Sequence, residues 1–151
     1  MTTTSKWTTP EGIVTLMSTD LNSLANSTSE STGKVLSSAI DNLTDLYLLM
    51  NIEVVLASIT SGSGSPYIGL WFLFQADGTN YETGSTTIDP AKAQHVVIPL
   101  KASYTGAQTV IIENIPIPPL PFKILLQNKA GAALASSGNT VKYRRHNEQG
   151  V

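Results

Sequence analysis

The chain has 151 residues, enough for one domain with a sizeable hydrophobic core. Its net charge of −2 lacks the basic excess that binding to phosphates needs, so we expect no nucleic-acid partner. The absence of cysteine excludes disulfides and thiol chemistry. No uninterrupted apolar run approaches the roughly 20 residues of a membrane helix, so we expect no membrane partner. The N-terminus lacks the apolar core of a secretory signal, which predicts synthesis in a cytoplasm.

Residues 1–18 are polar and rich in threonine, apart from one apolar island at residues 12–17. This pattern is typical of an extended arm or of a short edge strand. Trp7 stands alone among polar residues, and a large apolar side chain in such a place suggests an anchor in a neighbouring molecule. The alternative is that the arm folds back over its own domain. The candidate partner-binding residues are Trp7, Ile13, Val14, Leu16 and Met17.

The next segments contain little regular structure. Residues 18–26 predict a helix of at most two turns, and residues 27–34 a polar loop. The apolar spacing of residues 35–47 fits either a helix or a chain that enters a sheet. We therefore predict an N-terminal arm and polar loop over residues 1–34, followed by the folded domain over residues 35–151. We also expect the core of that domain to survive deletion of residues 1–18.

From residue 48 onward the apolar period changes to two, which is typical of half-buried strands. Met50, Ile52 and Val54 alternate with the polar Asn51 and Glu53. The predicted strands are residues 48–57, 67–75, 95–102, 108–115, 122–128 and 140–147.

Two of these strands carry additional information. Residues 67–75 have apolar side chains on both faces, including Trp71 and Leu73, which predicts a central strand covered by a loop or a neighbouring subunit. Pro99 cannot donate a ladder hydrogen bond, so its strand lies at an edge or carries a bulge. Strands with one apolar face pair those faces in two packed sheets. The sequence therefore predicts an all-β fold, an antiparallel β-sandwich of jelly-roll type with an extended N-terminal arm.

Residues 114–128 place four prolines directly before an apolar run. A proline-rich ligand for another domain sits in a polar, extended segment, whereas apolar side chains surround these prolines. Because proline removes backbone donors, strand pairing stops here. We therefore interpret the segment as a rigid connection between two strands, with its apolar side chains closing one end of the sandwich.

The residues with catalytic or ligand-binding potential form no recognised motif. His95 and His146 lack metal-ligand spacing, and Asp77, Glu82 and Asp89 flank a turn without the spacing of a calcium loop. No phosphate-binding or nucleophile motif is present. We expect no metal, no cofactor and no enzymatic activity.

The aromatic residues allow one further interpretation. Trp71, Tyr67, Tyr81 and Tyr104 would serve as a sugar-stacking platform if the fold brought them together. Because Trp71 lies in the middle of a strand, packing in the core or in an interface is the favoured interpretation of that residue.

Four phrases occur together and in order along the chain: "TDLNSLAN" (19–26), "DGTNYETG" (77–84), "IPIPPLPFKILLQNKAG" (115–131) and "NEQGV" (147–151). Together they resemble a family of small structural proteins encoded by tailed bacteriophages. In that family an "LNSLAN"-like segment precedes strands, and a "PLPP…FKFLL" segment precedes a C-terminal "NEQ". The phrases consist of turn and strand residues, so the resemblance implies no catalytic residue.

The resemblance implies a virion component, and we expect a capsid decoration, or cement, protein on the outer surface of the head. Its partners would be the major capsid protein and further copies of itself, with a trimer favoured. The alternative is a carbohydrate-binding or host-surface-binding module of a tail, fibre or head appendage, with host glycans as the partner.

Overall fold

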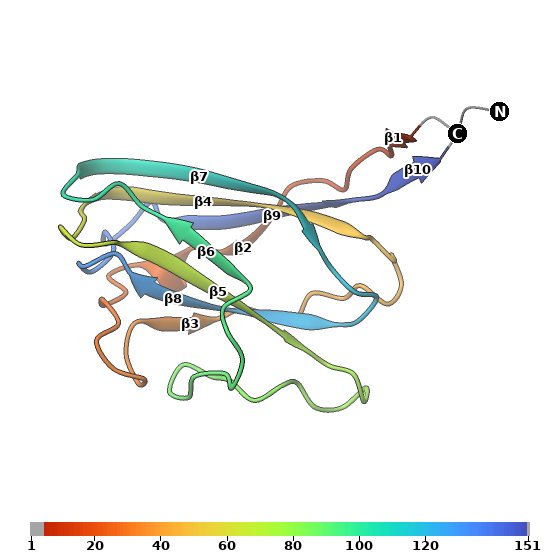
Figure 1. Ribbon diagram of the computed structural model, residues 1–151, viewed down its shortest axis with the longest axis horizontal. Helices are drawn as coiled ribbons and strands as arrows, with labels where there is room; N and C mark the ends of the chain where they lie inside the picture. Colours follow the sequence, from red (N-terminus) through yellow and green to blue (C-terminus); the bar gives the residue numbers. More distant parts are fainter. Residues whose placement is uncertain (1–4, 151) are drawn as a thin grey trace.

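The computed structural model describes residues 5–150 and shows two four-stranded antiparallel sheets packed face to face (Figure 1). The helical content of these residues is one 3-10 turn, η1 (Thr19–Leu21). No helix in the described part of the chain is long and apolar enough to cross a membrane. The prediction of an all-β sandwich is confirmed.

Each sheet contains strands that are distant in the sequence. The first sheet has the order β2 (Val14–Met17), β9 (Thr140–His146), β4 (Leu49–Thr60), β7 (Thr105–Pro116). The second has the order β3 (Lys34–Leu36), β8 (Phe122–Lys129), β5 (Tyr67–Phe74), β6 (Val96–Pro99). The six strands predicted from the period-two pattern correspond to β4 through β9.

The strand pairing is that of a jelly roll. β2 pairs with β9, β3 with β8, β4 with β7 and β5 with β6, all antiparallel. Each pair lies inside the preceding one along the chain, as in one long folded hairpin. The first and third pairs belong to the first sheet, and the second and fourth pairs belong to the second sheet. Pairing of β9 with β4 and of β8 with β5 joins the pairs into sheets. The prediction of a jelly-roll sandwich is therefore confirmed.

The core lies between the two sheets and follows the period-two pattern of the strands. In β4, Met50, Ile52, Val54 and Leu56 are at most 1% exposed, whereas the alternate residues face outward and are partly exposed. From the second sheet, Ile68, Leu70 and Phe72 of β5 and Phe122, Ile124 and Leu126 of β8 are equally buried. Burial of these side chains is the main stabilising contribution to the fold.

The outer faces of the two sheets differ. On the second sheet, Trp71, Leu73 and Leu125 form a separate buried cluster. Trp71 donates from Nε1 to the carbonyl oxygen of Lys92 at 2.9 Å, which fixes the loop between β5 and β6 over this face. The predicted cover over β5 is therefore a loop of the same chain, and Trp71 packs beneath it. On the outer face of the first sheet, by contrast, Ile111 is 55% exposed.

The predicted boundary after residue 34 is wrong. β2 lies in the first sheet beside β9, with Val14 opposite Tyr143 and a bulge between Thr15 and Met17. Met17 is 2% exposed and Leu21 is fully buried, so both belong to the core. The local sequence could not show this, because β2 pairs with a strand more than 120 residues away in the chain.

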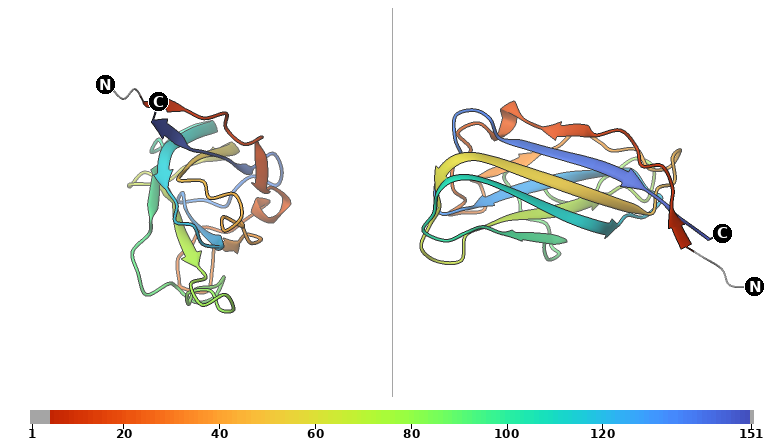
Figure 2. Two further views of the ribbon diagram at one scale, coloured as in Figure 1. Left: turned by 90° about the vertical axis from the view of Figure 1, so that its right-hand side faces the viewer. Right: turned by 90° about the horizontal axis from the view of Figure 1, so that it is seen from above.

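The segments flanking the sandwich pair with each other. β1 (Ser5–Trp7) and β10 (Glu148–Gly150) form a two-stranded antiparallel ribbon that projects from one end of the sandwich (Figures 1 and 2). The expected extended arm is therefore limited, among the described residues, to residues 5–13. Residues 1–4 of that arm lie outside the described residues.

The remaining connections between strands agree with the interpretations made from the sequence. Residues 35–47 do not form a helix; they enter the second sheet through β3 and continue as an irregular segment to β4. The proline segment joins β7, which ends at Pro116, to β8. Its Ile117 is 4% exposed and donates its N–H to the carbonyl oxygen of Leu48 at 2.9 Å. The interpretation of this segment as a connection whose apolar side chains close one end of the sandwich is confirmed.

Candidate functional site

Residues 8–11 lie along the end of β9 and hold the terminal ribbon in place. The N–H of Thr8 donates to the carbonyl oxygen of Asn147 at 2.9 Å, and the Thr8 hydroxyl accepts from the N–H of Asn147 at 3.1 Å. The N–H of Glu11 donates to the carbonyl oxygen of Arg145 at 2.9 Å. Trp7, directly before this segment, therefore has a defined position beside the first sheet.

A bulge in the pairing of β4 with β7 shapes the floor beneath Trp7. Met50 lies opposite Ile115 and Ile52 opposite Ile112, so Asn51 faces two residues of β7. One of them, Asn114, has a left-handed backbone with φ of 58°, which asparagine tolerates better than most residues. Its N–H donates to Oδ1 of Asn51 at 2.8 Å, which satisfies the backbone group that the bulge frees.

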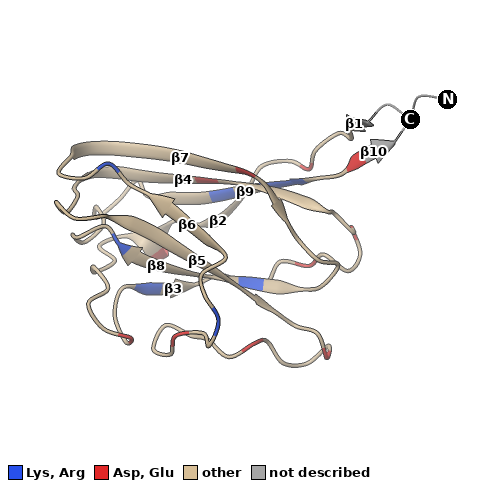
Figure 3. Ribbon diagram, in the orientation of Figure 1, with Lys and Arg blue, Asp and Glu red and all other residues tan. Residues whose placement is uncertain are grey.

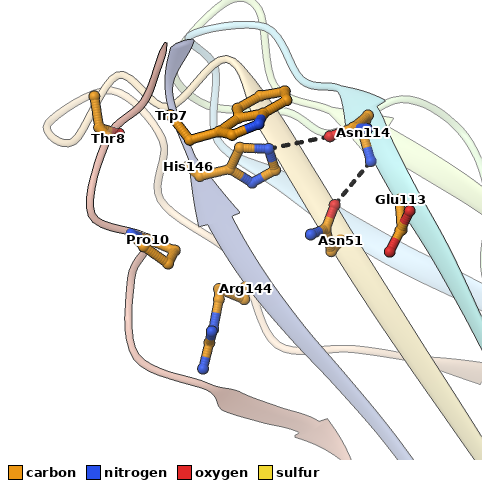
Figure 4. Close-up of a pocket in the computed structure, with 8 residues that line it drawn as sticks. All are labelled: Trp7, Thr8, Pro10, Asn51, Glu113, Asn114, Arg144 and His146. Atoms are coloured by element: carbon orange, nitrogen blue, oxygen red, sulfur yellow. Dashed lines mark hydrogen bonds between the residues drawn. The ribbon is translucent and has the colours of Figure 1, made fainter. Parts of the chain in front are cut away.

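The Trp7 indole rests on the edge of a buried histidine. Its ring centroid lies 5.1 Å from that of His146, with the two planes at 73° (Figure 4). Nε2 of His146 lies 3.2 Å from Oδ1 of Asn114, which anchors the imidazole to the bulge. His146 is 6% exposed, but Trp7 remains 57% exposed. The structure thus supports a large aromatic ring from one side and leaves the other to solvent.

Two adjoining hollows extend from Trp7 across the outer face of the first sheet. The first, of about 290 Å³, lies between Trp7, Pro10 and the bulge. The second, of about 270 Å³, lies between Ile13 and Ile111. Both are lined by Asn51, Glu113 and Arg144, so they form one depression, which we call the terminal groove. Its exposed apolar residues are Trp7, Ile13 and Ile111, at 57%, 65% and 55%.

The terminal groove contains one cation and one anion that are available to a ligand. Among the described residues, neither Arg144 nor Glu113 has an ion-pair partner within 4.0 Å. The neighbouring Lys142 and Glu53 pair with each other at 3.5 Å. Figure 3 shows that charged residues are sparse on the two sheets. Arg144 and Glu113 are therefore two of few charged side chains there. The groove combines apolar side chains with an arginine, as protein-binding hot spots do.

The structure divides the five residues predicted to bind a partner. Trp7 and Ile13 line the terminal groove. Met17 lies in the core, so it is not available as a surface contact. Val14 and Leu16 are partly buried against the core and contribute to the fold, and their contact with a partner stays a prediction.

The sequence analysis missed the parts of the groove that other strands supply: Asn51, Ile111, Glu113 and Arg144. Only Ile111 carried a local signal. In the alternating strand 108–115 it is an apolar residue on the outward face, between Thr109 and Glu113.

The three carboxylates considered for calcium serve other purposes. Asp77 accepts hydrogen bonds from the N–H groups of Thr79 and Asn80, and these lower its pKa to about 2. Glu82 pairs with Lys92, and Asp89 pairs with Lys34. Residues 5–150 contain no cluster of three or more histidine, aspartate or glutamate side chains suited to a metal ion.

The aromatic residues considered for sugar stacking are dispersed. Tyr67 opens β5, whereas Tyr81 follows the far end of that strand. Eight strand residues span roughly 25 Å, so these two rings lie at opposite ends of the second sheet. Trp71 is 6% exposed beneath its loop. The four aromatic residues therefore form no single platform.

Comparison with known proteins yields limited similarity. No family model and no curated sequence matches the chain. Among solved structures, dimeric latent PorU from Porphyromonas gingivalis superposes with a TM-score of 0.49 and 8% identity, covering 97% of this chain and 13% of that one. CBM32-1, from a family 31 glycoside hydrolase of Clostridium perfringens, superposes with a TM-score of 0.33 and 18% identity, covering 91% of this chain and 95% of that one. The chain thus spans a small part of the PorU chain. Both TM-scores are below 0.5, so the fold assignment rests on the strand topology above.

Proposed function

We propose that this protein is a structural component of a tailed-bacteriophage virion, a decoration protein that binds the outer surface of the head and stabilises it. The observation that carries the proposal is the exposed Trp7, held beside the terminal groove by the hydrogen bonds between Thr8 and Asn147 and by the edge contact with His146. Tryptophan is enriched among the residues that dominate the energy of binding interfaces, and here it stands beside further exposed apolar side chains of one groove. The resemblance of four sequence phrases to phage structural proteins suggests what that partner is.

The jelly-roll topology agrees with this role, since viral capsid proteins are among the proteins built on it. Lectins and enzymes share the fold, so fold analogy alone would not select a function. The terminal groove adds the selective argument. Its hollows are shallow, and they alternate apolar side chains with the charged Arg144 and Glu113. Such a surface suits a protein partner better than a small substrate.

In this proposal the partner is the major capsid protein. Trp7 inserts between its side chains, and Ile13 and Ile111 bury further apolar area around the groove. A carboxylate of the capsid protein pairs with Arg144, and a basic group faces Glu113. The protein acts through binding, without catalysis, and is made in the host cytoplasm before it joins the virion.

The alternative function, glycan binding, has one local observation in its favour. Tyr81, Asn80 and Leu120 line a hollow of about 440 Å³ in the loop that follows β5. However, the ammonium of Lys123 lies 4.5 Å from the centre of the Tyr81 ring, so a sugar stacking on that face has to displace it. Glycan-array binding that Tyr81→Ala abolishes would support this alternative, and an array without signal would favour the decoration role.

Cryo-electron microscopy of the virion tests the proposed location. We expect density that fits the eight-stranded sandwich on the outside of the head, with the terminal groove turned toward the capsid. Particles made without the protein should lack that density, and their heads should break open at a lower temperature. Density confined to the tail would contradict the proposal.

A further inference from the structure

The four edges of the two main sheets are unequal. Three end in short strands: β2 has four residues and a bulge, β3 has three, and β6 has four and ends at Pro99. Short strands, bulges and proline are the usual means by which proteins prevent an edge from pairing with another chain. β7, the fourth edge, has 12 residues. In the part of the chain that the structure describes, its backbone bonds are made to β4 alone.

β7 also lacks the charges that protect a long edge. Residues 105–112 contain no charged side chain, and Figure 3 shows β7 in tan except for a red segment toward its C-terminal end. Its register with β4 is regular from Gln108 to Ile112, so the middle of this edge is extended and free of bulges. Four consecutive β-branched residues, from Thr109 to Ile112, favour strand pairing there.

The side chains of β7 are less buried than those of any comparable strand. Val110, Ile112 and Ile115 face the core, yet all three are only partly buried. The opposing residues Ile52 and Val54 of β4 are at most 1% exposed. Ile111, on the outward face, is 55% exposed. β7 therefore has an unpaired edge, incompletely buried side chains toward the core and an exposed Ile111 on the outward face, and Figure 2 shows it at the margin of the first sheet.

We propose that β7 pairs antiparallel with β7 of a second copy of this chain, across a two-fold axis perpendicular to the first sheet. A two-fold contact needs only a strand that is compatible with itself, and the partner strand then has the same length and the same exposed apolar residues. Residues directly opposite each other in antiparallel strands point to the same face. One residue therefore lies opposite its own copy, next to the axis. If the axis passes near the middle of β7, that residue is Thr109, Val110 or Ile111.

The charge on β7 permits each of these three registers. Glu113 then lies opposite residue 105, 107 or 109 of the other copy, and these are Thr105, Ala107 and Thr109. No register places like charges opposite each other, which would oppose pairing. Pairing joins the two first sheets into one sheet of eight strands, and it covers Val110 and Ile112 at the former edge.

This contact has a geometric consequence for the terminal groove. A two-fold axis perpendicular to the sheet leaves the outer faces of both copies on the same side, so both grooves face one surface. A dimer then binds a capsid at two points, and its avidity exceeds the affinity of one groove. The contact builds a dimer, in place of the trimer that the sequence resemblance implies. The dimer itself does not depend on the proposed function.

Sedimentation equilibrium of the full chain tests the proposal. We expect the wild-type protein to have twice the mass of one chain and the double variant Thr109→Lys/Ile111→Lys to be monomeric. In all three registers the double variant places two lysines directly opposite each other across the axis. Within its own sheet, Lys at position 111 lies opposite Glu53, which supports the fold. The control Thr109→Gln/Ile111→Gln alters the same side chains without charge and should remain dimeric, as should Val97→Lys on the edge strand β6.

A wild-type chain that remains monomeric at all concentrations would overturn the proposal, and so would a dimer that tolerates the two lysines. If the double variant fails to fold, hydrogen exchange of the wild-type protein decides. Protection of the amides of residues 109–112 that increases with protein concentration supports the paired edge. Exchange that is independent of concentration overturns it.

Discussion

Glu11 and Arg145 form a two-point ion pair, with Nε donating to Oε2 and Nη2 to Oε1, each at 2.8 Å. The Arg145 side chain is 5% exposed and that of Glu11 is 21% exposed. Arg145 also donates to Asp45 at 3.0 Å, and its guanidinium lies 4.7 Å from the ring of Tyr47. The hydrogen bonds with Glu11 are the largest cause of a raised pKa of Arg145. The charges of Glu11 and Asp45 add to it, and burial opposes it. The pair fastens the segment after the terminal ribbon to β9.

Breaking this pair should destabilise the fold. Glu11→Gln removes the charge from two hydrogen bonds to a buried guanidinium, and we expect a loss of about 2 kcal/mol in the free energy of unfolding. Urea denaturation measures it. The matched control is Glu53→Gln, whose partner Lys142 is 36% exposed at the side chain and should cost under about 1 kcal/mol. Equal effects of the two substitutions would contradict the structural role of Glu11.

The position of Met17 predicts a second contrast. Met17→Ala removes a core side chain from β2 and should cost about 3 kcal/mol, whereas Ile13→Ala removes an exposed side chain and should cost under about 0.5 kcal/mol. For the same reason, deletion of residues 1–18 should lower the melting temperature strongly, contrary to the expectation from the sequence. A calorimetric melting curve unchanged by that deletion would show that β2 is dispensable.

His95 should titrate at a pH lower than an ordinary histidine. The N–H of Phe72 donates to its Nδ1 at 3.2 Å, and the imidazole stacks on the Phe72 ring with centroids 5.4 Å apart. Partial burial, and then the charge of Lys92, lower the pKa of His95 below 6.5, while the charge of Glu82 opposes this. Protonation also removes the acceptor for Phe72.

The unfolded chain therefore binds this proton more readily than the folded one, and stability is lost as the pH falls below about 6.5. Because the His95 residue is exposed overall, we expect the loss to be small. A nuclear magnetic resonance titration of the His146→Gln variant isolates His95, and a midpoint at or above 6.5 would contradict the account.

The sequence predicts what depends on local patterns. Alternation such as Met50, Asn51, Ile52 identifies β4, and the apolar residues on both faces of β5 predict a covered strand. The proline segment predicts a break between β7 and β8. Each of these features is decided within about ten residues of chain, and the structure confirms each.

The features that the sequence does not predict depend on pairing between distant segments. β1 pairs with β10 and β2 with β9, and each pair joins the two ends of the chain. The terminal groove combines Ile13, Asn51, Glu113 and Arg144 from four different segments. No local pattern relates these residues, because their proximity follows from the nested pairing of the whole jelly roll.

The proposed decoration role requires that the terminal groove, with Trp7, binds the outer surface of the phage head. Co-sedimentation of the purified chain with heads that lack it measures this directly. We expect saturable binding by the wild-type protein and about thirtyfold weaker binding by Trp7→Ala, since one buried tryptophan supplies roughly 2 kcal/mol to an interface. Ile88→Ala removes a similarly exposed side chain outside the groove and should bind like the wild type. Failure of the wild-type protein to bind heads, or equal binding by Trp7→Ala, would contradict the claim.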